Sequence, residues 1–144
     1  MIADMKKLFL VIAIAIFLSG CTKAQEIAKV EKTVIVQGTK TWDGTILPLY
    51  PQGQPEVTLV KFTIPPHTKL EWHKHPVINV GYMLKGSLSV ISEHGDELIL
   101  NEGDPIIELV NTSHYGENRT DAPVEIMVFY AGVKNEPFTT LIQD

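Results

Sequence analysis

The sequence contains a single cysteine, Cys21, among its 144 residues. Because a disulfide needs two cysteines, none can form within the chain. The sequence also lacks a phosphate-binding loop, a G-x-S-x-G nucleophile elbow and a pair of carboxylates at helical spacing. These absences argue against the hydrolase classes that depend on those motifs.

Clusters of lysine and arginine are missing as well. The chain has 12 basic and 17 acidic residues, which gives a formal net charge of −5. Nucleic acids and anionic lipid surfaces are recognised mainly through basic clusters. We therefore expect neither a nucleic-acid partner nor an electrostatic attraction to membranes.

A long apolar run occurs only near the start of the chain. Lys6 and Lys7 precede 11 apolar residues at 8–18, a length that fits the apolar core of a secretory signal and is too short to span a bilayer. The following residues complete the stretch LSGC at 18–21, which resembles the lipobox of bacterial lipoproteins. An ordinary signal peptide followed by an unmodified thiol is the alternative.

The lipobox resemblance implies a signal peptide at 1–20, an acylated Cys21 that begins a tether at 21–32, and a folded domain at 33–144. The protein would be exported and attached to the cell envelope by lipid. Thr22 stands where an inner-membrane retention Asp would be, which favours the outer membrane, facing the periplasm, in a Gram-negative host. Removal of 1–20 leaves 16 acidic and 10 basic residues, so the net charge becomes −6.

The rest of the chain is typical of an all-β protein. No segment after the signal shows ten residues of helical periodicity, whereas short runs of β-branched and aromatic residues alternate with turns rich in Gly, Pro, Asn and Asp. The predicted strands are 33–38, 56–64, 78–86, 87–92, 96–101, 105–110 and 123–132. Repeated strands at this spacing indicate a sandwich or a barrel.

Two of the five histidines form a His-x-His pair, His73 and His75. Side chains on a β-strand alternate between its faces, so residues two apart point the same way. The two imidazoles are therefore expected to face one side of a strand. Asn79 lies an even number of residues after His75, so its side chain is expected on the same side.

The pair belongs to a longer pattern that resembles the small single-domain cupins. Their first motif is Gly, five residues, His-x-His, three or four residues, Glu, six residues, Gly, and their second is Gly, five residues, Pro-x-Gly, two residues, His, three residues, Asn. In this chain the motif positions are His67, His73, His75, Asn79 and Gly86, then Gly103, Leu109, Asn111, His114 and Asn118. Every spacing fits, and both motifs with their flanking strands cover roughly 55–132.

The resemblance implies a double-stranded β-helix barrel, similar to a jelly roll, with a metal site inside it. The metal ligands that it implies are His73, His75 and His114, together with residue 79. Three imidazoles suit Fe, Mn, Ni, Cu or Zn better than Mg or Ca. A barrel that keeps the histidines but binds no ion is the alternative.

The chain departs from the cupin motifs at four positions. His67 and Asn111 replace glycines, where we expect turn residues with positive φ, and Leu109 replaces a proline. Asn79 replaces the glutamate that usually supplies the anionic ligand, and its amide oxygen remains as a weak neutral one. Glu108 is a candidate for the missing carboxylate, because it interrupts an apolar strand and is costly to bury without a compensating cation. A solvent-facing position on an edge strand is the alternative for Glu108.

Two functions remain open on the sequence. The first is a metal-dependent oxygenase, isomerase or related enzyme acting on a small organic molecule. The second is a module that binds a small ligand or a metal without catalysis. The resemblance fixes the fold better than the reaction, because this barrel hosts many functions. Barrels of this type often pair, so a homodimer is also left open.

Overall fold

The computed structural model describes residues 29–142, and the described part of the compact unit Thr33–Asp144 is built from β-strands. The expected signal peptide at 1–20, Cys21 and most of the tether lie outside the described residues. Within the described part, no helix is both long and apolar enough to cross a membrane.

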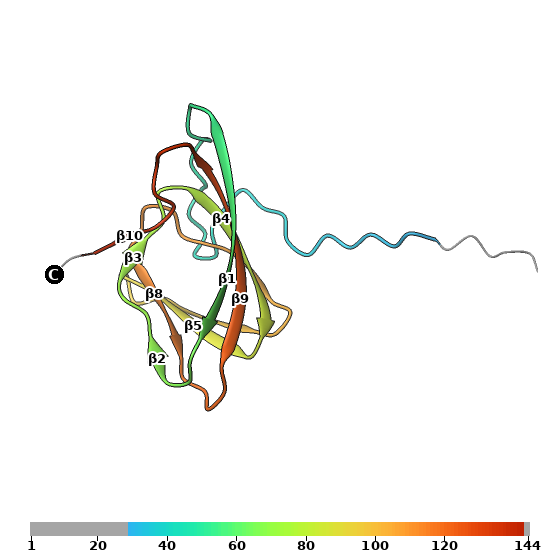
Figure 1. The fold of residues 1–144 in the computed structure, drawn as a ribbon, viewed down its shortest axis with the longest axis vertical. Helices are drawn as coiled ribbons and strands as arrows, with labels where there is room; N and C mark the ends of the chain where they lie inside the picture. The colour runs from blue at the N-terminus through green and yellow to red at the C-terminus, as the bar shows by residue number, and fades with distance from the viewer. Residues whose placement is uncertain (1–28, 143–144) are drawn as a thin grey trace, which may run out of the picture. The chain divides into compact units, whose positions relative to one another are not determined.

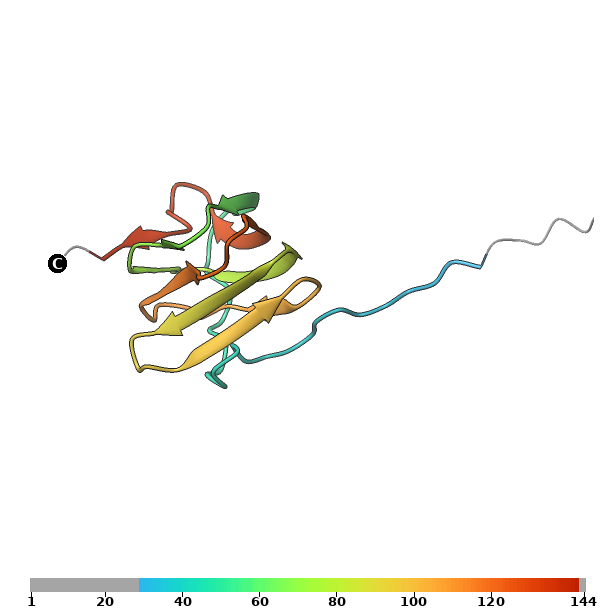
Figure 2. The same cartoon turned by 90° about the horizontal axis from the view of Figure 1, so that it is seen from below.

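The strands form two antiparallel sheets that enclose an apolar interior (Figure 1). One sheet has the order β1-β9-β4-β7. The other has the order β10-β3-β8-β5-β6, with β2 paired to β8, and Figure 2 shows its long β5–β6 hairpin. The strands are β1 (Pro55–Ile64), β2 (Thr68–Lys69), β3 (His73–Lys74), β4 (Ile78–Lys85), β5 (Ser87–Ser92), β6 (Glu97–Asn101), β7 (Pro105–Ile107), β8 (His114–Asn118), β9 (Val124–Val133) and β10 (Thr140–Leu141).

The prediction of an all-β fold is confirmed, and the predicted strands other than 33–38 and 105–110 closely match observed strands. The strand predicted at 33–38 is wrong. Its β-branched side chains are exposed and the segment pairs with no strand among the described residues, since a β-rich sequence forms a strand only where a sheet edge receives it. The strand predicted at 105–110 ends at Ile107.

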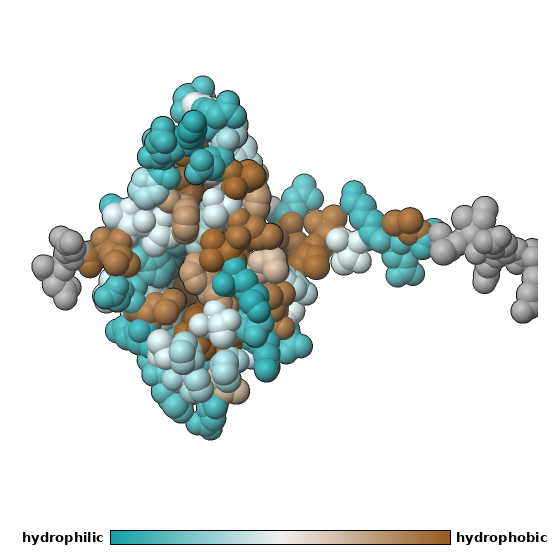
Figure 3. Space-filling model, viewed as in Figure 1, coloured by the Kyte–Doolittle hydropathy of each residue, from teal (hydrophilic) through white to brown (hydrophobic). Residues whose placement is uncertain are grey.

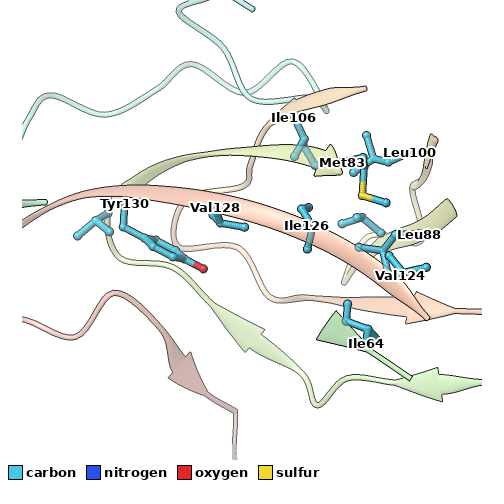
Figure 4. Packing of buried hydrophobic residues seen from close by; sticks show 11 residues of the cluster. Ile64, Met83, Leu88, Leu100, Ile106, Val124, Ile126, Val128 and Tyr130 are labelled. Carbon is cyan, nitrogen blue, oxygen red and sulfur yellow. The ribbon is translucent and has the colours of Figure 1, made fainter. Parts of the chain in front are cut away.

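The core lies between the sheets and is made by alternate residues of the long strands. In β9, for example, Val124, Ile126, Val128 and Tyr130 are buried, whereas the residues between them are more exposed (Figure 4). This alternation places one face of β9 in the interior. The core cluster comprises Ile64, Val77, Met83, Leu88, Val90, Leu100, Ile106, Val124, Ile126, Val128 and Tyr130.

The two residues expected at unusual turn positions have the expected backbone. His67 and Asn111 have φ values of 52° and 59°, a region in which Asn and His are tolerated better than most other side chains. His67 lies on the surface, where its Nε2 is 2.9 Å from the carboxylate of Asp121. Its role is therefore in the turn, at a distance from the interior histidines.

The last motif residue, Asn118, joins two loops at the end of the barrel. Its buried side chain donates to the carbonyls of Ile64, Pro65 and Ala122 and accepts from the backbone N–H and the hydroxyl of Thr120. Buried polar groups of this kind stabilise a fold when they are fully paired. Asn118 closes the barrel at the end of β8, the strand that begins with His114.

Candidate metal centre

Three histidines from two paired strands meet inside the barrel. His73 of β3 and His114 of β8 are direct partners in the sheet, and His75 follows two residues after His73. The ring centroids are 4.6 Å apart for His73 and His114, 5.0 Å for His73 and His75, and 5.1 Å for His75 and His114. One nitrogen from each ring lies within 4.8 Å of the other two, a spacing at which they could share a metal ion.

Each ring is oriented by a hydrogen bond from its other nitrogen. The Nδ1 atoms of His73, His75 and His114 lie 2.8 to 2.9 Å from the backbone carbonyls of Glu71, Phe138 and Thr112. A carbonyl can only accept, so each Nδ1 carries the hydrogen and the neutral ring keeps its lone pair on Nε2. Backbone partners of this kind fix the tautomer and orientation of metal-binding histidines.

Glu108 follows β7 and is buried against the same histidines. Its carboxylate oxygens lie 3.2 Å from Nε2 of His75 and 3.6 Å from Nε2 of His114, and its side chain is only 12% exposed. The solvent-facing alternative for Glu108 is therefore wrong. Residue 108 lies beside Asn79, because the Glu108 N–H donates to the Asn79 carbonyl across the β4–β7 edge at 3.2 Å.

Asn79 is fully buried, as its alternation with His73 and His75 predicts. Its Nδ2 makes one long contact, 3.4 Å, with the carbonyl of Val77, and its Oδ1 has no hydrogen-bond partner. The Nε2 atom of His114 is likewise buried without a partner within hydrogen-bond distance. Buried acceptors without a partner are uncommon, and an ion is one of the groups that can satisfy them.

The charges in the cluster shift the pKa values of its members in different directions. Burial raises the pKa of Glu108, but the close approach of His114 and His75, which would attract its charge when protonated, outweighs it and holds that pKa well below its usual value. Burial lowers the pKa of His114, but the nearby Glu108 carboxylate outweighs it and raises that pKa. Burial also lowers the pKa of His73, and its two histidine neighbours add to the effect.

The residues present fit a transition metal. With the hydrogens on Nδ1, the lone pair of His75 Nε2 faces a Glu108 oxygen at 3.2 Å, so two acceptors oppose each other unless a proton or a cation lies with them. Three imidazole nitrogens with a carboxylate beside them form a donor set that suits Fe, Mn, Ni, Cu or Zn. The structure thus brings together His73, His75, His114 and Glu108, whereas Asn79 is buried in the neighbouring strand, and the binding of an ion by these residues stays a prediction.

The C-terminal segment is a part of the centre that the sequence did not indicate. It provides the carbonyl of Phe138 and the hydroxyl of Thr139, which both contact Nδ1 of His75, and β10 pairs with β3 beside His73. A backbone carbonyl has no sequence signature, so residue type alone could not identify this contact. The centre opens into a cavity of about 270 Å³ that His73, His75 and Glu108 help to line.

Residues 60–130 match the family model described as Cupin domain. This segment is a cupin domain. It contains both histidine strands and Glu108, and the fold expected from the cupin motifs is confirmed by the two-sheet barrel. No curated protein matches the chain well enough to count as a relative.

Several solved structures share the cupin fold. A cupin-like protein from Thermotoga maritima aligns with a TM-score of 0.55 and 17% identity over 61% of this chain and 65% of its own. A DMSP lyase from Ruegeria pomeroyi aligns with a TM-score of 0.52 and 20% identity over 59% of this chain and 42% of its own. An oxalate oxidase in complex with the substrate analogue glycolate aligns with a TM-score of 0.52 and 16% identity over 60% of this chain and 46% of its own.

These likenesses concern the fold alone, because the identities are low. The chain spans less than half the length of the lyase and the oxidase that it matches. The two enzymes indicate how varied the reactions of cupin barrels are.

The electrostatics predict how the stability of the metal-free protein depends on pH. The raised pKa of His114 stabilises the fold below about 6.5, its unfolded value, and this contribution is lost as the pH rises through the folded value. The lowered pKa of Glu108 stabilises the fold above about 4.5 and is lost only in strong acid. The free energy of unfolding should therefore fall between pH 6 and pH 9 in urea titrations of metal-free protein.

Glu108→Gln removes the charge that raises the pKa of His114, so the fall between pH 6 and pH 9 should be smaller in this variant. Glu102→Gln, which changes an exposed glutamate, serves as the control and should behave like the wild type. An equal fall in the wild type and Glu108→Gln would contradict the assigned pairing.

Proposed function

We propose that this chain is a metal-dependent cupin that holds one transition-metal ion through His73, His75, His114 and Glu108 and acts on a small organic molecule in the adjoining cavity. The observation that carries the proposal is the convergence of three imidazole nitrogens, two of which lie against the buried carboxylate of Glu108. When bound, such an ion supplies Lewis-acid or redox chemistry. The chain's own residues orient the ligands, exclude water and provide the apolar cavity.

Glu108 supports the proposal because it provides the anionic ligand that Asn79 no longer offers. Its carboxylate lies against His75 and His114, and its backbone is hydrogen-bonded to Asn79. A carboxylate at position 108 can thus serve as the anionic ligand in place of one at position 79 without a change in the barrel, because the two positions are neighbours in the sheet. Asn79 keeps a buried, unpartnered Oδ1 and becomes a weaker neutral ligand.

A non-catalytic binding module is the second candidate. Two of the described residues that line the cavity carry a carboxylate, Glu71 and Glu108. Of these two, Glu108 is the one in contact with the histidines. If Glu108 serves as a metal ligand, it is no longer a free general base. An isomerase that needs a separate base is therefore less well supported than an oxygenase-type reaction or simple capture.

Elemental analysis of protein purified without chelators tests the metal. We expect about one transition-metal ion per chain, and at least about tenfold weaker binding in His73→Ala, His75→Ala and His114→Ala, since each removes a nitrogen donor. His94→Ala changes an exposed histidine of the β5–β6 hairpin and should keep the metal. Full metal content in the three interior variants would rule out the site.

Oxygen consumption by metal-loaded protein separates the two candidate functions. We expect turnover with at least one compound in a panel of catechols, flavonoids, keto acids and sugar-like compounds, and none in His114→Ala. Saturable ligand binding without turnover at full metal occupancy would favour the non-catalytic module. Because turnover is measured at full metal occupancy, the result reports on catalysis and not on metal binding.

The role of Glu108 has its own test. Glu108→Gln should raise the Kd for the metal about 10- to 100-fold, because it removes the anionic donor. The double variant Asn79→Glu/Glu108→Gln restores a carboxylate at the neighbouring position and should recover most of the affinity. Glu102→Gln serves as the matched surface control. If Glu108→Gln binds the metal as the wild type does, Glu108 is no ligand.

The proposed location follows from the start of the sequence. We propose that Cys21 carries the lipid that attaches the domain to the envelope, on the outer membrane in a Gram-negative host. The support is the lipobox-like stretch at 18–21 after a short apolar run. Cys21→Ser should move the protein from the membrane fraction to the soluble fraction when it is expressed with its own signal. Retention of this variant in the membrane fraction would contradict the anchor.

A further inference from the structure

The cavity beside the histidines has almost entirely apolar walls. It lies inside the barrel, and Figure 3 shows hydrophobic residues gathered around a hollow on the face that carries β1 and β3. Its volume is about 270 Å³. The walls come from both sheets and include Ile64, Leu70, Leu88, Val90, Ile126 and Val128.

The described polar side chains that line the cavity include no fixed positive charge. Among the described residues, no lysine or arginine lines the cavity, whereas Glu71 and Glu108 do. An anionic group on a ligand would therefore have only the metal ion to compensate it. A second anionic group that cannot reach the same ion would meet apolar walls or a carboxylate, and burial of an uncompensated charge is strongly unfavourable. A dianion such as fumarate, whose trans carboxylates cannot both bind one ion, is thus a poor match.

Gly116 helps to keep the cavity open. It lies in β8 between the inward-facing residues His114 and Asn118 and is itself buried. Its φ is not positive, so backbone conformation does not require glycine here, although glycine inside a strand weakens it. A Cβ at this position would sit 3.4 Å from Leu70 and 3.5 Å from Leu88, in ordinary contact, and a larger side chain would extend among the cavity walls. The glycine therefore leaves space where other residues would fill the barrel.

We propose that the cavity binds a compact, uncharged and mainly apolar molecule, about the size of a substituted single ring, with one polar group turned toward His73, His75 and Glu108. A cavity of about 150 Å³ with similar walls holds benzene, so about 270 Å³ accommodates a ring with substituents. Tyr130 and Thr139 also line the space and can hydrogen-bond to a hydroxyl or carbonyl. The inference rests on the proposed function of the same site, and it specifies the ligand class.

Ligand titrations of metal-loaded protein test the inference with 4-methylphenol and fumarate as probes. We expect 4-methylphenol to bind with a Kd at least tenfold lower than that of fumarate. In methyl NMR spectra, the signals that move should be those of cavity residues such as Leu70, Leu88 and Val128. A lower Kd for fumarate, or shifts confined to surface methyl groups, would overturn the inference.

A pair of variants on one strand sharpens the test. Gly116→Val adds a side chain inside the cavity and should weaken 4-methylphenol binding at least tenfold with unchanged metal content. Glu117→Val adds the same side chain on the opposite face of β8 and should leave binding unchanged. Equal binding by both variants would overturn the inference. If Gly116→Val does not fold, the NMR mapping on the wild type decides.

The failure of this inference is distinguishable from the failure of the proposed function. Metal content by elemental analysis reports on the histidine centre alone. The methyl shifts report on the apolar walls and are measurable in metal-free protein as well. Metal binding without binding of 4-methylphenol would overturn the ligand class only, whereas methyl shifts in a protein that binds no metal would overturn the metal centre only.

Discussion

The centre of this molecule depends on one electrostatic constraint. Lone pairs on three imidazole nitrogens lie close to one another and to the negative charge of Glu108, and His75, His114 and Glu108 are buried. Such a group of acceptors is stable only if a proton or a metal cation lies with them. The raised pKa of His114 and the lowered pKa of Glu108 are two signs of this requirement in the protein without metal.

The rest of the barrel holds that convergence in place. The pairing of β3 with β8 sets His73 opposite His114, and backbone carbonyls fix all three rings so that Nε2 faces inward. The pairing of β4 with β7 brings Glu108 beside Asn79, so a carboxylate reaches the histidines from a neighbouring strand. Residues of the apolar core, such as Ile64, Leu88 and Val128, form walls of the cavity that adjoins the site.

Much of the fold and of the candidate site follows from the sequence. The His-x-His pair and the spacing to His114 are motif-based signals, and the structure brings these three histidines together. The alternation that extends to Asn79 is a local signal, and Asn79 is buried as it indicates. The short strands β2, β3, β8 and β10 were not among the predicted strands, because two-residue strands and the polar sequence HYGEN of β8 carry little β-propensity. Tertiary pairing alone makes them strands.

Other features depend on contacts that a sequence does not display. Residues 33–38 have a strand-like composition, yet no strand among the described residues pairs with them. Glu108 could also have faced solvent, since β7 is an edge strand, but in the structure its side chain lies on the same inward face as the buried Ile106 two residues earlier. The carbonyl of Phe138, which holds His75 from the C-terminal segment, belongs to the backbone and has no residue signature.

X-ray absorption spectroscopy at the edge of the bound metal tests the central claim most directly, because it identifies the atoms around the ion. The account predicts three imidazole nitrogens and one or two oxygens in the coordination shell, with metal–nitrogen distances of about 2.0–2.1 Å if the ion is zinc. A spectrum with no imidazole scattering, or with a single imidazole, would contradict it.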